Sequence, residues 1–98
     1  MDYKLVLKPR AENDLANGIE WYESKQKGLS IKFLKCVEKY LERIHKNPLH
    51  YPLKKNQYRE AFIEKFPYMI IYEVLENEVV VFSVFNTDQN PEKKILSE

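Results

Sequence analysis

The stretch "YMIIYEVLENEVVVFSVFN", residues 68–86, decides the fold. Its two apolar runs, 68–75 and 78–86, are separated only by Glu76 and Asn77. Strands are rich in β-branched and aromatic residues, and a link this short between two strands is typical of an antiparallel hairpin. The stretch therefore predicts the centre of an antiparallel sheet.

The sequence upstream supplies the rest of the expected architecture. Two sets of apolar residues recur at the spacing of amphipathic helices: Ala11, Leu15, Ile19 and Tyr22, and then Phe33, Cys36, Val37, Tyr40, Leu41 and Ile44. Gly28 separates the two sets, so we expect an antiparallel helical hairpin, with Ser30 capping the second helix. The expected elements are a strand at 3–8, helices at 10–26 and from Ser30 to Pro48, a loop at 47–57, and strands at 58–65, 68–75 and 78–86.

This order, β-α-α-β-β-β, predicts one α+β domain spanning 1–98. The helical hairpin should pack on one face of a mostly antiparallel four-stranded sheet. Alternate residues of 68–75 and 78–86 are apolar on both sides, which two helices cannot easily cover. A partner protein could cover the second face, as bare apolar surface often marks such sites, or the loop 47–57 and the tail 91–98 could fold over it.

Charge is distributed unevenly along the chain. The net charge is +1, but residues 25–59 carry ten Lys or Arg against two Glu, which indicates an acidic or polyanionic partner. The first residues lack the pattern of a secretory signal, no apolar run could span a bilayer, and Cys36 is the only cysteine. We therefore expect a cytoplasmic protein without a disulfide.

Four segments carry a resemblance to a known family. They are "ENDLANGIEWYESKQKGLSIKFLK" (12–35), "NPLHYPL" (47–53), "YREAFIEKFPYMIIYEV" (58–74) and "VVVFSVFNTDQNPEK" (79–93). In this order, over nearly the full length, the chain resembles the RelE/ParE toxins of type II toxin–antitoxin systems, and it is closer to the ParE-like branch. The resemblance implies the β-α-α-β-β-β fold, a role of the plasmid-stabilisation kind, and an antitoxin that neutralises the protein by wrapping it.

The resemblance also implies a cellular target. ParE-like members poison DNA gyrase, whereas RelE-like members cut messenger RNA on the ribosome. RelE-like nucleases are similar in placing an arginine where Met69 stands, and family members often have histidine and arginine where Asn86 and Gln89 stand. Met69, Asn86 and Gln89 can neither titrate nor carry charge, so the family's cleavage chemistry lacks its usual groups. We therefore expect a toxin that binds its target; the alternatives are a divergent endoribonuclease and a non-toxic family member.

Candidate site residues follow from these comparisons and from the residue types. The catalytic candidates of the nuclease hypothesis are Arg59, Tyr72 and Asn86. The partner-binding candidates are Arg59, Tyr68, Tyr72 and Phe85, and a basic row on the second helix formed by Lys32, Lys35, Lys39 and Arg43. The tyrosines could instead be core residues, and the row could be the solvated side of an amphipathic helix. His45 and His50 lack a third ligand, so we expect no metal site, and no motif indicates a cofactor.

Overall fold

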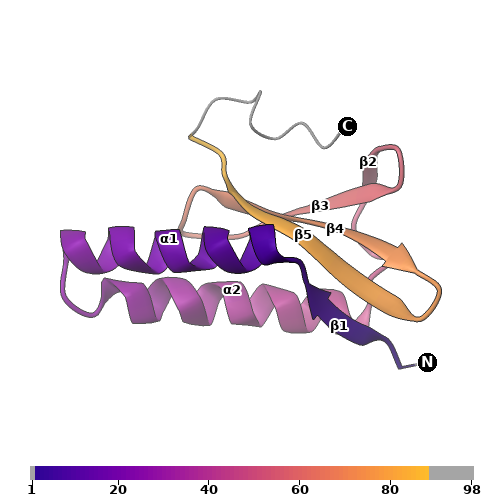
Figure 1. Cartoon of the computed structure of the whole chain (residues 1–98), viewed down its shortest axis with the longest axis horizontal. Coiled ribbons are helices and arrows are strands. Elements are labelled where there is room, and N and C mark those ends of the chain that lie inside the picture. The colour runs from indigo at the N-terminus through magenta and orange to yellow at the C-terminus, as the bar shows by residue number, and fades with distance from the viewer. Residues whose placement is uncertain (1, 89–98) are drawn as a thin grey trace.

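A computed structural model describes residues 2–88 of the chain (Figure 1). The elements follow in the order β1 (Lys4–Leu7), α1 (Pro9–Lys25), α2 (Leu29–Lys46), β2 (Leu53–Lys55), β3 (Tyr58–Phe62), β4 (Tyr68–Leu75) and β5 (Glu78–Asn86). The last two strands have the bounds that the sequence predicts. The predicted strand at 58–65 ends three residues early at Phe62, because the chain then turns through Lys65 at a φ of 73°.

The five strands form one sheet in the order β1-β5-β4-β3-β2, rather than the four strands expected. The additional strand, β2, lies within the predicted loop at 47–57 and pairs antiparallel with β3. Its three residues are all exposed, so no apolar alternation marks them in the sequence. A turn at Asn56, with a φ of 54°, folds β2 onto β3, and asparagine tolerates this left-handed backbone better than most residues.

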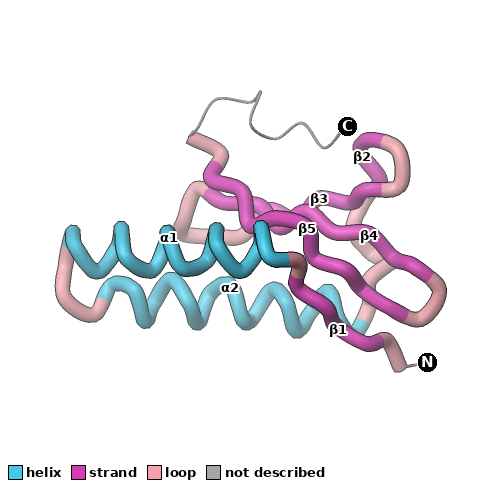
Figure 2. The backbone as a smooth tube through the Cα atoms, in the orientation of Figure 1, coloured by secondary structure: helices cyan, strands magenta, loops and turns pink. Residues whose placement is uncertain are grey.

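The two helices lie together on one side of the sheet, as Figure 2 shows. Their apolar stripes pack on β4 and β5 in a cluster that contains the completely buried residues Phe33, Val37, Ile44 and Ile70. β1 lies beside β5 and runs parallel to it, with Leu5 opposite Val79 and Leu7 opposite Val81. The predicted helical hairpin on one face of a mostly antiparallel sheet is therefore confirmed.

An irregularity in β5 explains why this strand does not alternate. The register between β4 and β5 shifts at Ile71/Tyr72, where Ser83 lies opposite Ile71 and Val81 lies opposite Tyr72. The extra residue, Phe82, reverses the side on which later residues lie, as a β-bulge does. As a result Val81 and Val84 share the helix-facing cluster although they are three residues apart.

The second face of the sheet differs from the bare surface that the sequence predicts. Met69, Ile71 and Phe85 form a separate cluster flanked by Tyr58 and Phe82, and they are only 4%, 1% and 5% exposed. The expectation of bare apolar surface is therefore wrong for these residues.

The alternative that the loop 47–57 covers that face finds no support in the apolar packing of the described residues, because only Tyr58 and Phe82 pack against Met69, Ile71 and Phe85. Tyr51, in this loop, packs against the helix-facing cluster instead. The tail 91–98 lies outside the described residues. Phe62 remains 60% exposed at the end of β3.

A carboxylate closes the turn between the two helices. Gly28, at a φ of 86°, precedes α2, and no side chain caps this helix, so the predicted capping role of Ser30 is wrong. The N-cap position is taken by Gly28, two residues before Ser30, and its backbone is left-handed, which glycine adopts without strain. The Ser30 hydroxyl instead donates to Glu23 at 2.6 Å. The Glu23 carboxylate also accepts the Gly28 amide at 3.1 Å. These bonds to the charged form lower the pKa of Glu23.

We expect Glu23→Gln to remove a pH-dependent part of the stability. Because the folded pKa of Glu23 lies below its ordinary value of 4.5, the contribution is complete above that value. It disappears as the pH falls through the lowered folded pKa. Urea midpoints measured from pH 7 down to pH 3 should therefore differ most between the wild type and the variant at neutral pH, and should converge in acid. The exposed Glu20, on the same helix, provides the control: Glu20→Gln should leave the profile unchanged.

Candidate functional site

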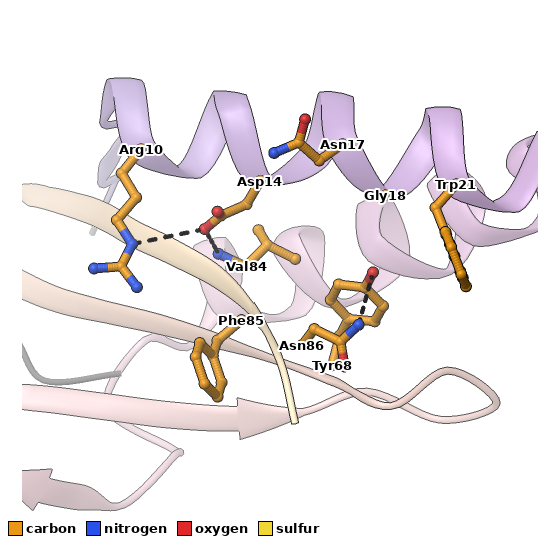
Figure 3. A pocket seen from close by; sticks show the side chains of 9 residues that line it. All are labelled: Arg10, Asp14, Asn17, Gly18, Trp21, Tyr68, Val84, Phe85 and Asn86. Carbon is orange, nitrogen blue, oxygen red and sulfur yellow. Dashed lines mark hydrogen bonds and ion pairs between the residues drawn. The ribbon is translucent and has the colours of Figure 1, made fainter. Parts of the chain in front are cut away.

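A pocket of about 430 Å³ lies between α1 and the C-terminal end of β5 (Figure 3). One side of α1 and the ends of β4 and β5 supply its walls. The lining residues are Arg10, Asp14, Asn17, Gly18, Trp21, Tyr68, Val84, Phe85 and Asn86. The pocket thus lies at the strand end where the resemblance places family residues.

Asp14 fastens α1 to β5 at the floor of this pocket. Its Oδ2 accepts the Ser83 hydroxyl at 2.7 Å and the Val84 backbone N–H at 3.0 Å. The same oxygen lies 4.0 Å from Nε of Arg10, one helical turn earlier. Ser83 is completely buried, so its hydroxyl depends on this acceptor. The carboxylate is therefore committed to structural hydrogen bonds.

Tyr68 and Asn86 lie opposite each other at the ends of β4 and β5. The Asn86 side-chain amide donates to the Tyr68 hydroxyl at 3.4 Å, and its Oδ1 accepts the Asp88 backbone N–H at 2.8 Å. Burial raises the pKa of Tyr68, so its hydroxyl is protonated at neutral pH. This pair can donate and accept hydrogen bonds, but it supplies no group that exchanges protons near neutral pH.

Trp21 borders the pocket as an exposed aromatic ring. Its side chain comes from the fourth turn of α1 and is 53% exposed, with Lys25 Nζ 4.1 Å from the ring centroid. An exposed tryptophan beside polar groups is a common anchor for a protein partner, because it buries a large area with few torsions to fix. The sequence leaves the position of Trp21 open, whereas the structure exposes it.

The structure separates the catalytic candidates of the nuclease hypothesis. Arg59 lies opposite Tyr72, while Asn86 lies opposite Tyr68, four residues earlier in β4. At about 3.3 Å per residue, the two places are about 13 Å apart along the strand. The three residues therefore do not form one catalytic group.

Arg59 and Tyr72 hold the loop that follows α2. Arg59 donates to the Tyr51 carbonyl oxygen at 2.5 Å, and the Tyr72 hydroxyl donates to the Pro48 carbonyl oxygen at 2.5 Å. Tyr72 is completely buried, and this burial raises its pKa to about 12. Its ring is thus not available for stacking on a partner, and the core alternative describes Tyr72 correctly.

The other partner-binding candidates lie at two separate places. Tyr68 and Phe85 line the pocket, although each is only 5% exposed. Lys32, Lys35 and Lys39 are exposed along α2 and line a different groove, with Arg43 stacked on the Tyr40 ring at 4.8 Å.

Sequence reasoning missed Arg10, Asp14 and Asn17 as pocket residues. Their spacing along one side of a helix is visible in the sequence, but the approach of that side to the end of β5 is not. Among residues 2–88, no cluster of histidine, cysteine or acidic side chains could hold a metal ion. No helix in this described part is long and apolar enough to cross a membrane.

These features define a class: a small α+β protein with a helical hairpin on one face of its sheet and a pocket between α1 and the end of β5. Comparison with known families identifies the family to which the chain belongs. Residues 5–91 match the model of the ParE toxin of the type II toxin–antitoxin system parDE, and the chain belongs to this family. The predicted resemblance to the ParE-like branch is confirmed.

A solved structure supports the same fold. The chain is similar to a structure described as a chromosomal ParDE toxin–antitoxin system from P. aeruginosa, with a TM-score of 0.78 and 14% sequence identity. The match covers 86% of this chain and 95% of the other. At this identity the similarity shows the fold alone. No curated protein sequence matches the chain significantly.

Proposed function

We propose that this ParE-family protein is a toxin that acts by docking on a cellular target, and that a cognate antitoxin holds it inactive. By analogy with ParE-like toxins, the target is DNA gyrase. The pocket between α1 and β5 is the proposed contact site. Family membership supports the toxin role, and the similarity to a ParDE system supports an antitoxin partner.

The chemistry of the pocket is the observation that favours docking over catalysis. Asp14 is engaged by Ser83 and Val84, and Tyr68 keeps its proton at neutral pH. General acid–base catalysis is most efficient with a group that titrates near the operating pH, and RNA cleavage also needs cations beside the phosphate. The cation among the lining residues, Arg10, lies 4.0 Å from the Asp14 carboxylate, which offsets its charge. Beside this pair the pocket offers an exposed indole with the Asn17 and Asn86 amides nearby, which suits recognition.

Trp21→Ala is expected to weaken target binding by at least about tenfold, because an anchoring tryptophan contributes about 2 kcal/mol or more to an interface. Expression of the wild type alone should arrest bacterial growth, and co-expression of the adjacent open reading frame should restore it. The variant should arrest growth less at equal protein level. Purified wild type should inhibit gyrase supercoiling, and the variant should need a higher concentration to do so.

Ile31→Ala is the matched control, since Ile31 is 57% exposed on α2 outside the pocket. It should behave as the wild type in growth and supercoiling assays. Cleavage of messenger RNA on purified ribosomes would contradict the docking proposal and support the nuclease hypothesis. Absence of a growth defect, together with no complex with the neighbouring gene product, would contradict the toxin role.

A further inference from the structure

A second groove lies on the molecule, apart from the pocket between α1 and β5. It has a volume of about 430 Å³ and runs between α2 and the turn that joins β3 to β4. α2 contributes Lys32, Lys35, Cys36, Lys39 and Tyr40, and the turn contributes Glu64, Lys65 and Phe66. None of these residues lines the first pocket.

The rim of this groove is cationic. Lys32, Lys35 and Lys39 follow each other at three- and four-residue intervals, so they project from the same side of α2. Lys65, far away in the sequence, faces them from the turn. With one glutamate among the lining residues, the four lysines give a net charge of +3. Such a concentration of like charge in a concave surface favours an anionic ligand.

The floor of the groove is apolar and fixed. The Phe66 ring packs against Tyr22 and Phe33, with centroid distances of 5.0 and 5.3 Å, so its position is set by the aromatic cluster beneath it. Tyr40 is 5% exposed, and the Cys36 thiol donates to the Glu64 carbonyl oxygen at 3.1 Å. This thiol contact ties the turn to α2. The groove is thus preformed, and binding requires little ordering of the protein.

We propose that this groove binds an acidic peptide segment of a partner protein, with one apolar side chain inserted between α2 and Phe66. Carboxylates would pair with the lysine rim, while the apolar anchor would cover the floor. A sugar–phosphate backbone would satisfy the lysines equally well, but it would leave the apolar floor uncovered. The combination of rim and floor therefore favours a peptide over a nucleic acid. This inference does not depend on the proposed action at the α1–β5 pocket.

Fluorescence anisotropy with defined probes tests the proposal. The probe is a labelled peptide of Asp and Glu with one central Leu, and the comparison probes are the same peptide with Ser for Leu and a labelled thymidine oligonucleotide. The Leu peptide should bind most tightly. Its affinity should fall between about 50 and about 200 mM NaCl, because screening weakens the exposed charge pairs.

Lys35→Glu combined with Lys39→Glu should weaken binding of the Leu peptide by about tenfold or more, through lost attraction and added repulsion. Lys54→Glu combined with Lys55→Glu is the matched control, as it makes the same charge change on the exposed strand β2. This control should weaken binding less than about twofold, because only long-range attraction is reduced. Thermal unfolding of both variants shows that the substitutions leave the fold intact.

Cys36 offers a second, independent measurement. It is the chain's only cysteine and it lines the groove, so bound peptide should slow its reaction with a thiol reagent. Tighter binding of the oligonucleotide than of the Leu peptide would overturn the proposal in favour of a nucleic-acid surface. The proposal would also be overturned if the two lysine variants lost equal peptide affinity, if the Leu and Ser peptides bound equally tightly, or if no peptide bound.

Discussion

Phe33→Ala is expected to destabilise the protein by about 4 kcal/mol, the usual cost of truncating a buried phenylalanine. Phe33 is completely buried, and its ring contacts three others, Tyr22, Phe66 and Tyr68, at centroid distances of 4.9 to 5.3 Å. The truncation would open a cavity where both helices meet the sheet. Since small domains are stable by only about 5–15 kcal/mol, the variant should unfold at a much lower urea concentration.

The close approach of Gly18 to the Phe33 ring allows a second test of the packing at this place. A Cβ atom on Gly18 would lie 2.7 Å from Cε2 of Phe33, which is too close for two carbon atoms. Gly18→Ala should therefore destabilise the wild type, although alanine favours a helix over glycine by about 1 kcal/mol. In the Phe33→Ala background the obstructing ring is absent, so the same change should become stabilising.

Urea unfolding of the two single variants and the double variant measures this coupling. Ile31→Ala, two residues from Phe33 but exposed on α2, should change the stability by no more than about 0.5 kcal/mol. Additive effects of the Gly18 and Phe33 substitutions would show that the ring does not limit the space at Gly18.

Asp14→Ala is expected to cost about 3 kcal/mol, because it removes the acceptor of two inward-facing donors. The Ser83 hydroxyl is completely buried, and the Val84 N–H belongs to the part of β5 beyond its pairing with β1. Each donor left without a partner costs about 1–3 kcal/mol. Amide hydrogen exchange at Val84 should accelerate more than exchange at Val79, which lies opposite Leu5 within the sheet.

Ser83→Ala in the Asp14→Ala background should recover part of the lost stability, because it removes the orphaned hydroxyl. Glu12→Ala is the control, since Glu12 is an exposed acidic residue on the same helix. A loss below about 0.5 kcal/mol for Asp14→Ala, a typical effect for a surface substitution, would show that water replaces the carboxylate and that Asp14 does not fasten α1 to β5.

The sequence alone determined the two helices and the two central strands, β4 and β5. The helical spacing of 10–26 and of the stripe from Phe33 to Ile44 predicted α1 and α2 to within a residue or two, and the short link at Glu76–Asn77 fixed β4 and β5. These features follow from the period of apolar residues, which each segment carries by itself. The order of elements and the family motifs also led to the correct family.

Only the tertiary structure decided how distant segments meet. β2 carries no apolar alternation, and it forms because β3 offers a free edge for Leu53 and Lys55. The bulge at Phe82 shifts the alternation of β5 by one residue. Counting alternate residues from one end of the strand therefore assigns the residues beyond the bulge to the wrong face of the sheet. Asp14 meets Ser83 across 69 positions of sequence, and no local pattern encodes that contact. Periodicity describes the environment of a residue within its own element, whereas a site depends on the packing of several elements, which the whole chain determines together.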